Sequence, residues 1–348
     1  MSVTSPIRWG KDGPNGNFDD MWLPVFGGEV IAAWERFNLF QDKVRTIVMP
    51  SGNEKKFPKT WRIGSEYHEV GVELLGLDME TKEVTITLDD RPLVSHFELD
   101  DVDLAMSHFE VRSQIAKESG MELARNFDKQ SAILLLGAAR TAASGSFPGG
   151  TNSVDRNTTG FGDLQTIGRA GAVATLNAIE NWLIYREDND IPNEEGNLFC
   201  AVYPGMWYAL KNLGMPQTST EVSNGLTPVF QHPDFNPRSN TIDQGGPINA
   251  PLLYNGVQIF RTSNLPGSVT NNTIVGSNIT TGPTRYQGDF TTTAGVCWSP
   301  EAIGRLILMG IKTETERSVR RGSDFTVTKM LTGGGTLRPE VAYELKTA

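Results

Sequence analysis

Hydrophobic side chains recur at helical spacing through residues 101–143, a stretch that contains no proline. Members of the stripe lie three, four or seven positions apart, as in an amphipathic helix: Ala105, Phe109, Ala116, Gly120, Leu123, Phe127, Leu134 and Ala138. Asp100 and Asp101 can accept the free amide hydrogens at its start, and Ser144-Gly145 ends it. At about 1.5 Å per residue the helix would be roughly 60 Å long, so we expect it to lie along a flat layer. Because an interior glycine costs roughly 1 kcal/mol, two shorter helices broken near Gly120 are the alternative.

The N-terminal part divides into an arm and a helix. Residues 1–24 contain three glycines and three prolines with little periodicity, and we expect a flexible arm there. From Phe26 to Leu39 the apolar residues again recur at helical spacing, which predicts a short amphipathic helix. Its apolar face must cover another element.

Residues 44–97 change to β character. Short runs predict strands at Val44–Met49, Phe57–Ile63, Val84–Leu88 and Leu93–Phe97. The segment between the second and third runs combines glycines with acidic residues, namely Gly64, Gly71, Gly76, Glu66, Glu69, Glu73 and Asp78. An isolated hairpin is marginally stable in water, so we expect this acidic two-stranded arm to lie on another surface.

The second half of the chain predicts a small α/β unit and then more strands. Residues 144–169 are rich in Gly, Ser, Asn and Thr and predict a loop, as do residues 215–251 with their six prolines. Between the loops we expect a helix at Ala170–Arg186, a buried strand at Leu198–Tyr203 and a helix at 206–214. The later strands are expected at Val257–Arg261, Gly295–Trp298 and Ile303–Thr315, with Phe325–Leu331 and Val341–Leu345 as a hairpin-like pair flanking Gly333-Gly334-Gly335.

Composition narrows the class of protein. The chain has 348 residues, 38% of them hydrophobic, no run of eighteen apolar residues and no apolar segment near its N-terminus, so we expect neither a membrane span nor a secretory signal. The formal charge of −10 argues against a protein whose main task is gripping nucleic acid. Cys200 and Cys297 both stand in apolar sequence, which favours two buried reduced thiols over a disulfide.

The sequence contains no constellation typical of catalysis. The four histidines have no metal-ligand spacing, and neither cysteine has a histidine nearby in sequence. Gly160-Phe161-Gly162 is an incomplete dinucleotide pattern that follows a loop. Glu66, Glu69 and Glu73 could hold a cation, although a solvated or ion-paired face explains them better. We therefore expect no catalytic residues, no metal and no cofactor, and an enzyme of unrecognised type is a remaining alternative.

Several segments carry apolar or charged faces with no obvious partner in the chain. Such faces usually find their partners on other copies of the same chain. Five stretches then resemble tailed-phage major capsid proteins of the HK-ninety-seven fold, nearest to those of short-tailed phages of the T-seven type. They are VFGGEV (25–30), SGNEKKFP (51–58), VTITLDD (84–90), ELDDVDLAMSHFEVRSQ (98–114) and GGGTLRPEVA (333–342).

The resemblance implies an α+β fold with the parts of such a capsid protein. They are an N-arm at 1–44, an extended E-loop at 45–97, a P-domain with its spine helix at 98–145 and 306–348, a linking loop at 146–167, and an A-domain at 168–305. It implies hexamers and pentamers that build an icosahedral head around double-stranded DNA, without a cofactor. A scaffolding protein during assembly, a portal and a decoration protein are the further partners implied. The location implied is the virion, assembled in the cytoplasm of a bacterial host.

We hypothesise ion pairs between neighbouring subunits of such a shell. The acidic E-loop residues Glu66, Glu69, Glu73 and Asp78 would meet basic residues of an adjacent copy, the candidates being Arg112, Arg125, Arg317, Arg320, Arg321 and Arg338. Some relatives crosslink an E-loop lysine to a neighbouring asparagine, but Lys55, Lys56, Lys59 and Lys82 show no specific signature, and we expect no covalent bond. An encapsulin-like compartment shell of the same fold is the alternative function.

Overall fold

The computed structural model describes most of the chain. The described residues are 19–68, 70–71, 73, 76, 79–100, 111–156, 169–194, 196–211, 251–266, 284–286, 288–318 and 322–347. The residues outside these ranges include 1–18 of the predicted arm and 101–110, the first ten residues of the predicted long helix. They also include 157–168 and 212–250, which cover most of the two predicted loops.

The described ranges contain both helices and strands. The helices are α1 (Asp19–Phe37), η1 (Gln41–Lys43), α3 (Val111–Ala139), α4 (Ser153–Arg156), α5 (Arg169–Asp188), α6 (Pro204–Lys211), η3 (Thr284–Tyr286) and η4 (Pro339–Val341). The strands are β1 (Arg45–Val48), β2 (Glu54–Thr60), β3 (Thr81–Thr87), β4 (Leu93–Asp100), β5 (Thr151–Asn152), β6 (Leu198–Val202), β7 (Leu252–Tyr254), β8 (Val257–Arg261), β9 (Thr293–Trp298), β10 (Ile303–Ser318), β11 (Ser323–Thr336) and β12 (Ala342–Lys346).

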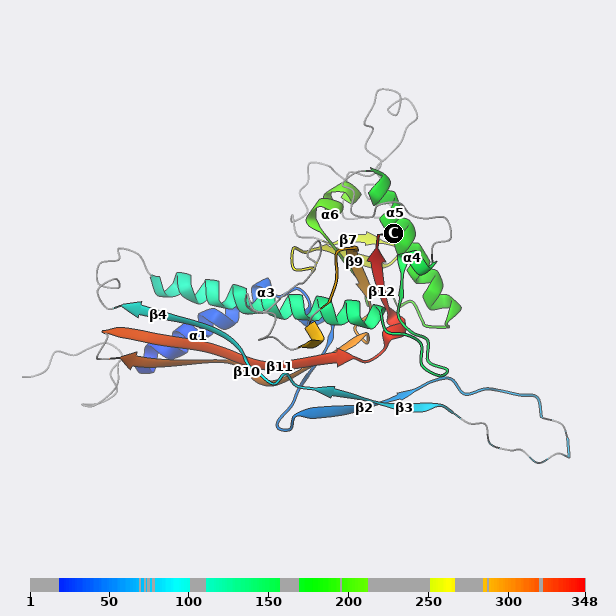
Figure 1. The fold of residues 1–348 in the computed structure, drawn as a ribbon, viewed down its shortest axis with the longest axis horizontal. Coiled ribbons are helices and arrows are strands. Elements are labelled where there is room, and N and C mark those ends of the chain that lie inside the picture. The colour runs from blue at the N-terminus through cyan, green and yellow to red at the C-terminus, as the bar shows by residue number, and fades with distance from the viewer. Residues whose placement is uncertain are drawn as a thin grey trace, which may run out of the picture.

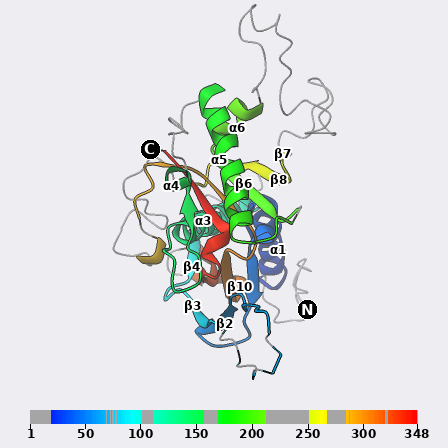
Figure 2. The same cartoon turned by 90° about the vertical axis from the view of Figure 1, so that its right-hand side faces the viewer.

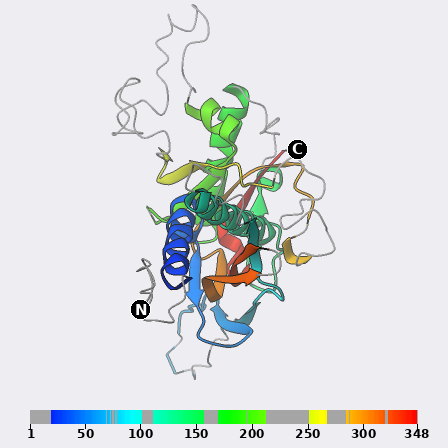
Figure 3. The same cartoon turned by 90° about the vertical axis from the view of Figure 1, so that its left-hand side faces the viewer.

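An elongated layer forms one half of the molecule (Figure 1). Its sheet has the order β1-β10-β11-β4, and the long strands β10 and β11 pair antiparallel along α3. Figure 3 looks along the long axis and shows α1 and α3 side by side next to this sheet. Apolar residues of α1, α3 and the sheet meet in one core, which contains Phe26, Val30, Trp34, Leu93, Ala116, Leu123, Phe127 and Met330. The apolar face of α1 therefore covers α3, as its spacing predicts.

α3 is continuous through Gly120, so the prediction of one long helix is confirmed over the described residues and the two-helix alternative is wrong. The glycine is required by a close approach of α1. A Cβ atom at position 120 would lie 2.6 Å from the carbonyl oxygen of Val30 and 2.8 Å from the Cβ of Ala33. Helix α1 itself begins at Asp19, within the predicted arm.

The second half is a six-stranded sheet of order β5-β12-β9-β6-β8-β7, standing at one end of the layer (Figure 1). Figure 2, turned by 90°, shows β6 and β8 of this sheet above β10. Its central strand β6 is buried on both faces. Leu198, Cys200 and Val202 face a core shared with α5 and α6, whereas Phe199 and Ala201 face a core shared with the second half of α3. The continuous apolar run of this strand is typical of such two-sided burial.

The strand pairing after residue 300 differs from the prediction. The predicted hairpin-like pair around Gly333-Gly334-Gly335 is wrong, because the glycines lie inside β11 and the hairpin partner of β11 is β10. The glycines allow another strand segment to approach, since a Cβ at Gly333 would lie 2.5 Å from the Cα of Leu88. The resemblance also places residues 306–348 together in the sheet beside the spine helix. β10 and β11 lie there, whereas β12 pairs with β9 in the six-stranded sheet.

Two buried carboxylates join α3 to the rest of the chain. Just after its C-terminal end, Arg140 forms a two-pronged ion pair with the fully buried Glu344 of β12, at 2.6 and 2.7 Å. In the middle of α3, the fully buried Asp128 accepts hydrogen bonds from the amides of Leu39 and Phe40, and from the side chain of Asn264 at 3.3 Å. The long helix is thereby bonded to the segment after α1, to the segment after β8 and to β12.

The packing at Gly120 can be tested with a matched pair of glycines on α3. Gly120→Ala places a methyl group against the backbone of α1, and we expect a loss of about 1–3 kcal/mol in the free energy of unfolding. At Gly137 nothing lies within 4 Å of the position that a Cβ would occupy, so Gly137→Ala should instead stabilise by up to about 1 kcal/mol. Denaturant unfolding of the purified variants, followed by circular dichroism, measures both. Equal effects at the two sites would contradict the close packing.

Asp128 predicts a pH dependence of stability. Burial raises the pKa of its carboxyl to about 7 from an ordinary value of 3.8, against the opposing hydrogen bonds of Leu39, Phe40 and Asn264 and the charge of Lys43. The folded chain then binds more protons than the unfolded chain between these two values. Stability contributed by this group therefore falls as pH rises from about 4 to about 7, with a slope of at most about 1.4 kcal/mol per pH unit.

Asp128→Asn removes this titration, and its unfolding free energy should vary less between pH 5 and pH 8 than that of the unmodified chain. Glu122→Gln, at a solvent-accessible position of the same helix, serves as the control and should leave the profile unchanged. Identical profiles for Asp128→Asn and the unmodified chain would show that Asp128 does not titrate in this range.

Candidate functional site

The hairpin of β2 and β3 extends from the body and is the most exposed described part of the chain (Figure 1). Its strands pair antiparallel from Glu54 opposite Thr87 to Thr60 opposite Thr81. At its base, Phe57 and Ile86 share an apolar cluster with residues of the body, namely Met49, Leu88, Leu306 and Leu337. This cluster supplies the core that two strands lack. The sequence predicts that the hairpin lies on another surface. At the base of the hairpin this surface is present, and it belongs to the same chain.

Polar contacts hold strand β2 and Arg62, which follows it. The ammonium of Lys59 lies 2.8 Å from the fully buried carboxylate of Glu340 and 4.7 Å from the centre of the Phe147 ring. Arg62 forms an ion pair with Asp190 at 2.6 Å and also donates to the main-chain oxygen of Asn189, just beyond the C-terminal end of α5. These contacts tie β2 to the unit that contains the six-stranded sheet.

Strand β3 is held by a different segment, the turn at 144–147. Glu80 accepts a hydrogen bond from the amide of Ser146 at 2.8 Å, and hydrogen bonds from Ser146 lower the pKa of the Glu80 carboxyl. Lys82 donates to the hydroxyl of Ser144. Each strand of the hairpin thus has its own attachment, so the direction in which the hairpin leaves the body is fixed by the folded chain.

Beyond these attachments, the described tip residues project into solvent. Ile63 is 63% exposed and Val70 is 97% exposed, while Tyr67 is fully exposed. The predicted contact residues Glu66 and Glu73 are also exposed. Apolar side chains presented together with carboxylates at the end of an extended arm are typical of a surface that contacts another molecule. The sequence prediction emphasised the acidic residues and missed the apolar ones, although a tyrosine and a valine in a glycine-rich acidic segment could have indicated them.

The structure brings none of the hypothesised acidic and basic contact residues together within the described part of one chain. Glu69, Asp78, Arg320 and Arg321 lie outside the described residues, as does the side chain of Arg112. Among the others, Arg125 is exposed on α3 and pairs with Glu122 at 3.4 Å. Arg317 pairs with Asp324 at 3.0 Å near the end of β10, which lies at the opposite end of the long axis from the hairpin tip (Figure 1). A contact between the tip and this arginine therefore requires a second copy.

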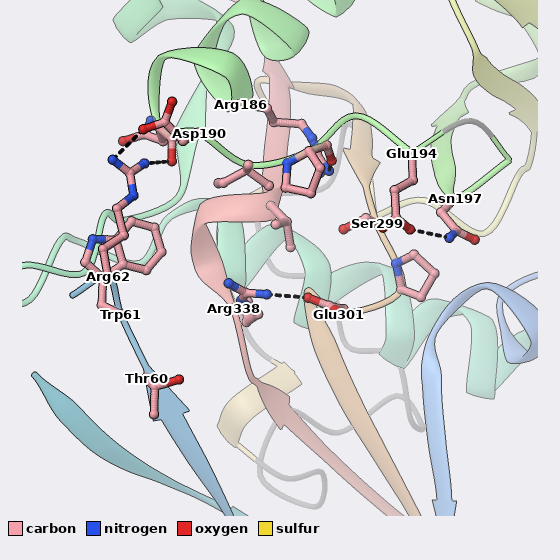
Figure 4. A pocket seen from close by; sticks show the side chains of 15 residues that line it. Thr60, Trp61, Arg62, Arg186, Asp190, Glu194, Asn197, Ser299, Glu301 and Arg338 are labelled. Carbon is pink, nitrogen blue, oxygen red and sulfur yellow. Dashed lines mark hydrogen bonds and ion pairs between the residues drawn. The ribbon is translucent and has the colours of Figure 1, made fainter. Parts of the chain in front are cut away.

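A cleft of about 560 Å³ opens beside the hairpin base, between β2, the end of α5 and η4. Figure 4 shows its charged side chains, which form pairs inside the chain: Arg62 with Asp190, and Arg338 with Glu301 at 2.5 Å. Arg338 also pairs with the buried Glu340 at 3.0 Å, which places this predicted contact residue at the attachment of the hairpin.

Arg186 lines the same cleft and holds the chain that leaves α5. It is 3% exposed and donates to the side chain of Asn193 at 2.8 Å and to the main-chain oxygen of Pro192 at 2.7 Å. Burial lowers the pKa of its guanidinium to about 10. The charged side chains of the cleft thus bond to other groups of the same chain. Among the described lining residues there is no nucleophile with a neighbouring base.

The described residues show no other centre of chemistry. Among them, no group of three His, Cys, Asp or Glu residues is arranged to hold a metal ion. Nor does the described part of the chain contain a helix long and apolar enough to cross a membrane. Among the described features, the exposed hairpin and its attachment to the body are therefore the candidate functional site.

Comparison with solved structures identifies the class. The fold superposes on the capsid of the cyanophage P-SCSP1u with a TM-score of 0.64 and 26% sequence identity, covering 89% of this chain and 88% of that one. It superposes equally well, with a TM-score of 0.64, on the mature capsid of bacteriophage PhiM1, at 15% identity over 89% of this chain and 87% of that one. The fold is the HK-ninety-seven-like fold of phage capsid subunits, with both helices and sheets, as predicted.

Sequence comparison gives the family. Residues 56–346 match the Gp10A-like family of major capsid proteins, and the chain belongs to that family. Over 110 residues it is 31% identical to the major capsid protein of Escherichia phage T7, an alignment that spans 31% of this chain and 32% of that protein. The same identity and length are found with the T7 minor capsid protein, of which the alignment spans 27%. The chain thus matches less than two thirds of the length of either relative.

The attachment of the hairpin can be tested at Lys59. Lys59→Met removes one of the two cations that pair with the buried Glu340, and we expect a loss of about 1–3 kcal/mol in the free energy of unfolding. Hydrogen exchange should become faster in β2 and β3. The control is Lys56→Met, because Lys56 pairs with Glu83 at 2.7 Å between side chains that are more than half exposed, and its loss should change neither quantity. Equal responses of the two variants would exclude a special role for Lys59.

Proposed function

We propose that the chain is the subunit of an icosahedral phage head, which assembles from hexamers and pentamers and encloses double-stranded DNA. Membership of the major capsid protein family supports the proposal, and so does the likeness of the fold to phage capsids. The observation that carries it in this molecule is the hairpin, which is attached to the body at its base and exposed at its described tip. The family match to phage proteins favours a head over a compartment shell of the encapsulin kind.

The proposal gives each part of the chain a place in the shell. Residues 1–44 form the N-arm, 45–97 the E-loop, 98–145 and 306–348 the P-domain, 146–167 the linking loop and 168–305 the A-domain. The strand β12 is the exception within these ranges, because it joins the last residues of the chain to the six-stranded sheet. A scaffolding protein, a portal and a decoration protein are the further partners, and assembly takes place in the bacterial cytoplasm before the virion is released.

The charge of the chain suits packaging. A formal charge of −10 disfavours strong adhesion of DNA, which has to move into and out of the head. The chain would therefore enclose nucleic acid without a sequence-specific site. No cofactor and no covalent crosslink is required by the proposed function, since many weak contacts repeated over the shell hold it closed.

The proposed function is tested by the state of the purified protein. Sedimentation and electron microscopy should show hexamers, pentamers or closed shells, alone or after addition of the scaffolding protein. A stable monomer or dimer under all of these conditions would contradict the proposal.

The contact surface itself is tested by charge reversal at the tip. Glu66→Lys with Glu73→Lys should lower the yield of shells, because each tip then repels the basic residues that we propose as its partners, Arg125, Arg317 and Arg338 among those described. One exposed ion pair contributes only about 0–1 kcal/mol, but the loss is repeated at every subunit. Shells are counted by electron microscopy after gradient sedimentation. The control changes the charge equally at exposed residues of α1 and α3, by Glu35→Lys with Glu118→Lys. Normal shells from the tip variant would refute the role of these carboxylates.

A further inference from the structure

The only two cysteines of the sequence lie face to face in the six-stranded sheet. Cys200 on β6 and Cys297 on β9 are directly opposite each other in the antiparallel pairing of these strands. Their sulfur atoms are 3.1 Å apart, and both residues are fully buried, as free thiols. The sequence predicted two buried thiols, but nothing in the spacing of residues 200 and 297 indicated that they would touch.

The backbone geometry at this pair suits a covalent bridge. Residues directly opposite in an antiparallel sheet have Cα atoms about 4.5 or 5.5 Å apart. Disulfides span Cα separations of about 4.4–6.8 Å, so a bond between these sulfurs needs no strand movement. The two side chains also point to the same face, into the core that contains Trp182, Val202 and Tyr343.

We propose that Cys200 and Cys297 form a two-electron oxidation site, which a small peroxide converts into a cross-strand disulfide inside the six-stranded sheet. One thiolate attacks a peroxide oxygen, the O–O bond breaks, and the residue becomes a sulfenic acid while the leaving oxygen takes up the released proton as water. The sulfur of the second cysteine then attacks the sulfenic sulfur. The S–S bond forms, the S–O bond breaks, and a second water leaves. In sum, two thiols and one hydrogen peroxide give one disulfide and two waters.

The surroundings of the pair determine which oxidants can act. Burial and the neighbouring Cys200 raise the pKa of the Cys297 thiol, so little thiolate is present and the reaction is slow. In its core the pair lies among apolar residues and beside the buried Tyr343, which is opposite Cys297 in the pairing of β12 with β9. Because both sulfurs are fully buried, a small peroxide should react far faster than a bulky disulfide such as oxidised glutathione.

The bond would connect two central strands of the sheet. It closes a covalent loop that contains α6, β7 and β8 and runs from β6 to β9. Such a loop restricts the unfolded chain and thereby stabilises the folded one. Glutathione keeps thiols reduced inside cells. By the proposed function the chain leaves the cell in a virion, where no thiol buffer opposes the oxidation.

The experiment uses the purified full chain, reduced and then freed of reductant. After treatment with hydrogen peroxide, or with oxidised glutathione as the bulky comparison, the chain is denatured, its free thiols are alkylated with a maleimide and its intact mass is measured. We expect the peroxide-treated chain to lose about 2 Da, the two thiol hydrogens, and to take up no maleimide until dithiothreitol is added. On a non-reducing gel it should migrate as a single chain. Its melting temperature should rise above that of the reduced chain.

Cys200→Ser controls for other oxidised residues, including the ten methionines. This variant should show neither the rise in melting temperature nor the internal bond, and its remaining cysteine should stay open to maleimide or gain oxygen. The mass measurement on the unmodified chain stands even where the variant folds poorly. Two maleimides on the peroxide-treated chain, two oxidised cysteines without an S–S bond, or chains linked to one another would each overturn the proposal. Because none of these results depends on shell formation, failure here is distinct from failure of the proposed function.

Discussion

α3 is the element that joins the two halves of the described molecule. At 29 residues it is roughly 44 Å long, and it packs against α1 and the long sheet in its first half and against the six-stranded sheet in its second. A body of this shape is only a few elements thick and cannot surround a single large core. The two halves must therefore be fixed to one another by specific contacts along the helix.

Among these contacts, the ion pair of Arg140 with Glu344 has the best-defined geometry. Glu344 is fully buried, and its carboxylate also accepts a hydrogen bond from Thr293 at 2.6 Å, so its oxygens are well satisfied. Such a pair adds little net stability, because removing both charges from water costs about as much as their attraction returns. Removing one partner, however, leaves a buried charge. The pair therefore selects one arrangement of sheet against helix, and Asp128 with the amides of residues 39 and 40 does the same for the segment after α1.

The sequence predicted what depends on local pattern and missed what depends on contact between distant segments. The sequence predicts α3, β6 and β3 because each has a recognisable local pattern. These patterns are the apolar stripe of α3, the continuous apolar run of β6 and the alternation in β3. The glycines at 333–335 are misinterpreted because glycine permits both a turn and a close approach, and only the segments packed against them, such as Leu88 beside Gly333, decide between the two. The true turn between β10 and β11 offered a weaker signal, a single glycine at 322 with a left-handed backbone. Likewise the acidic tip was predicted, whereas Lys59 and Arg62 are ordinary surface residues until Glu340 and Asp190 are placed beside them.

The attachment of the hairpin explains how a thin arm can serve assembly. Ordering a flexible segment at the moment of binding costs free energy for each side chain and backbone bond that is fixed, and weak interfaces cannot supply much. Here the apolar cluster around Phe57 and the contacts of Lys59, Arg62 and Glu80 order the base before any partner arrives. The described residues of the tip lie beyond these attachments and are exposed for contact. Its exposed Tyr67 and Val70 can then contribute burial of apolar surface, while the carboxylates at 66 and 73 restrict which surfaces it accepts. Because the attachments reach η4, the end of α5 and the turn after α3, the direction of the arm depends on how these three segments are placed.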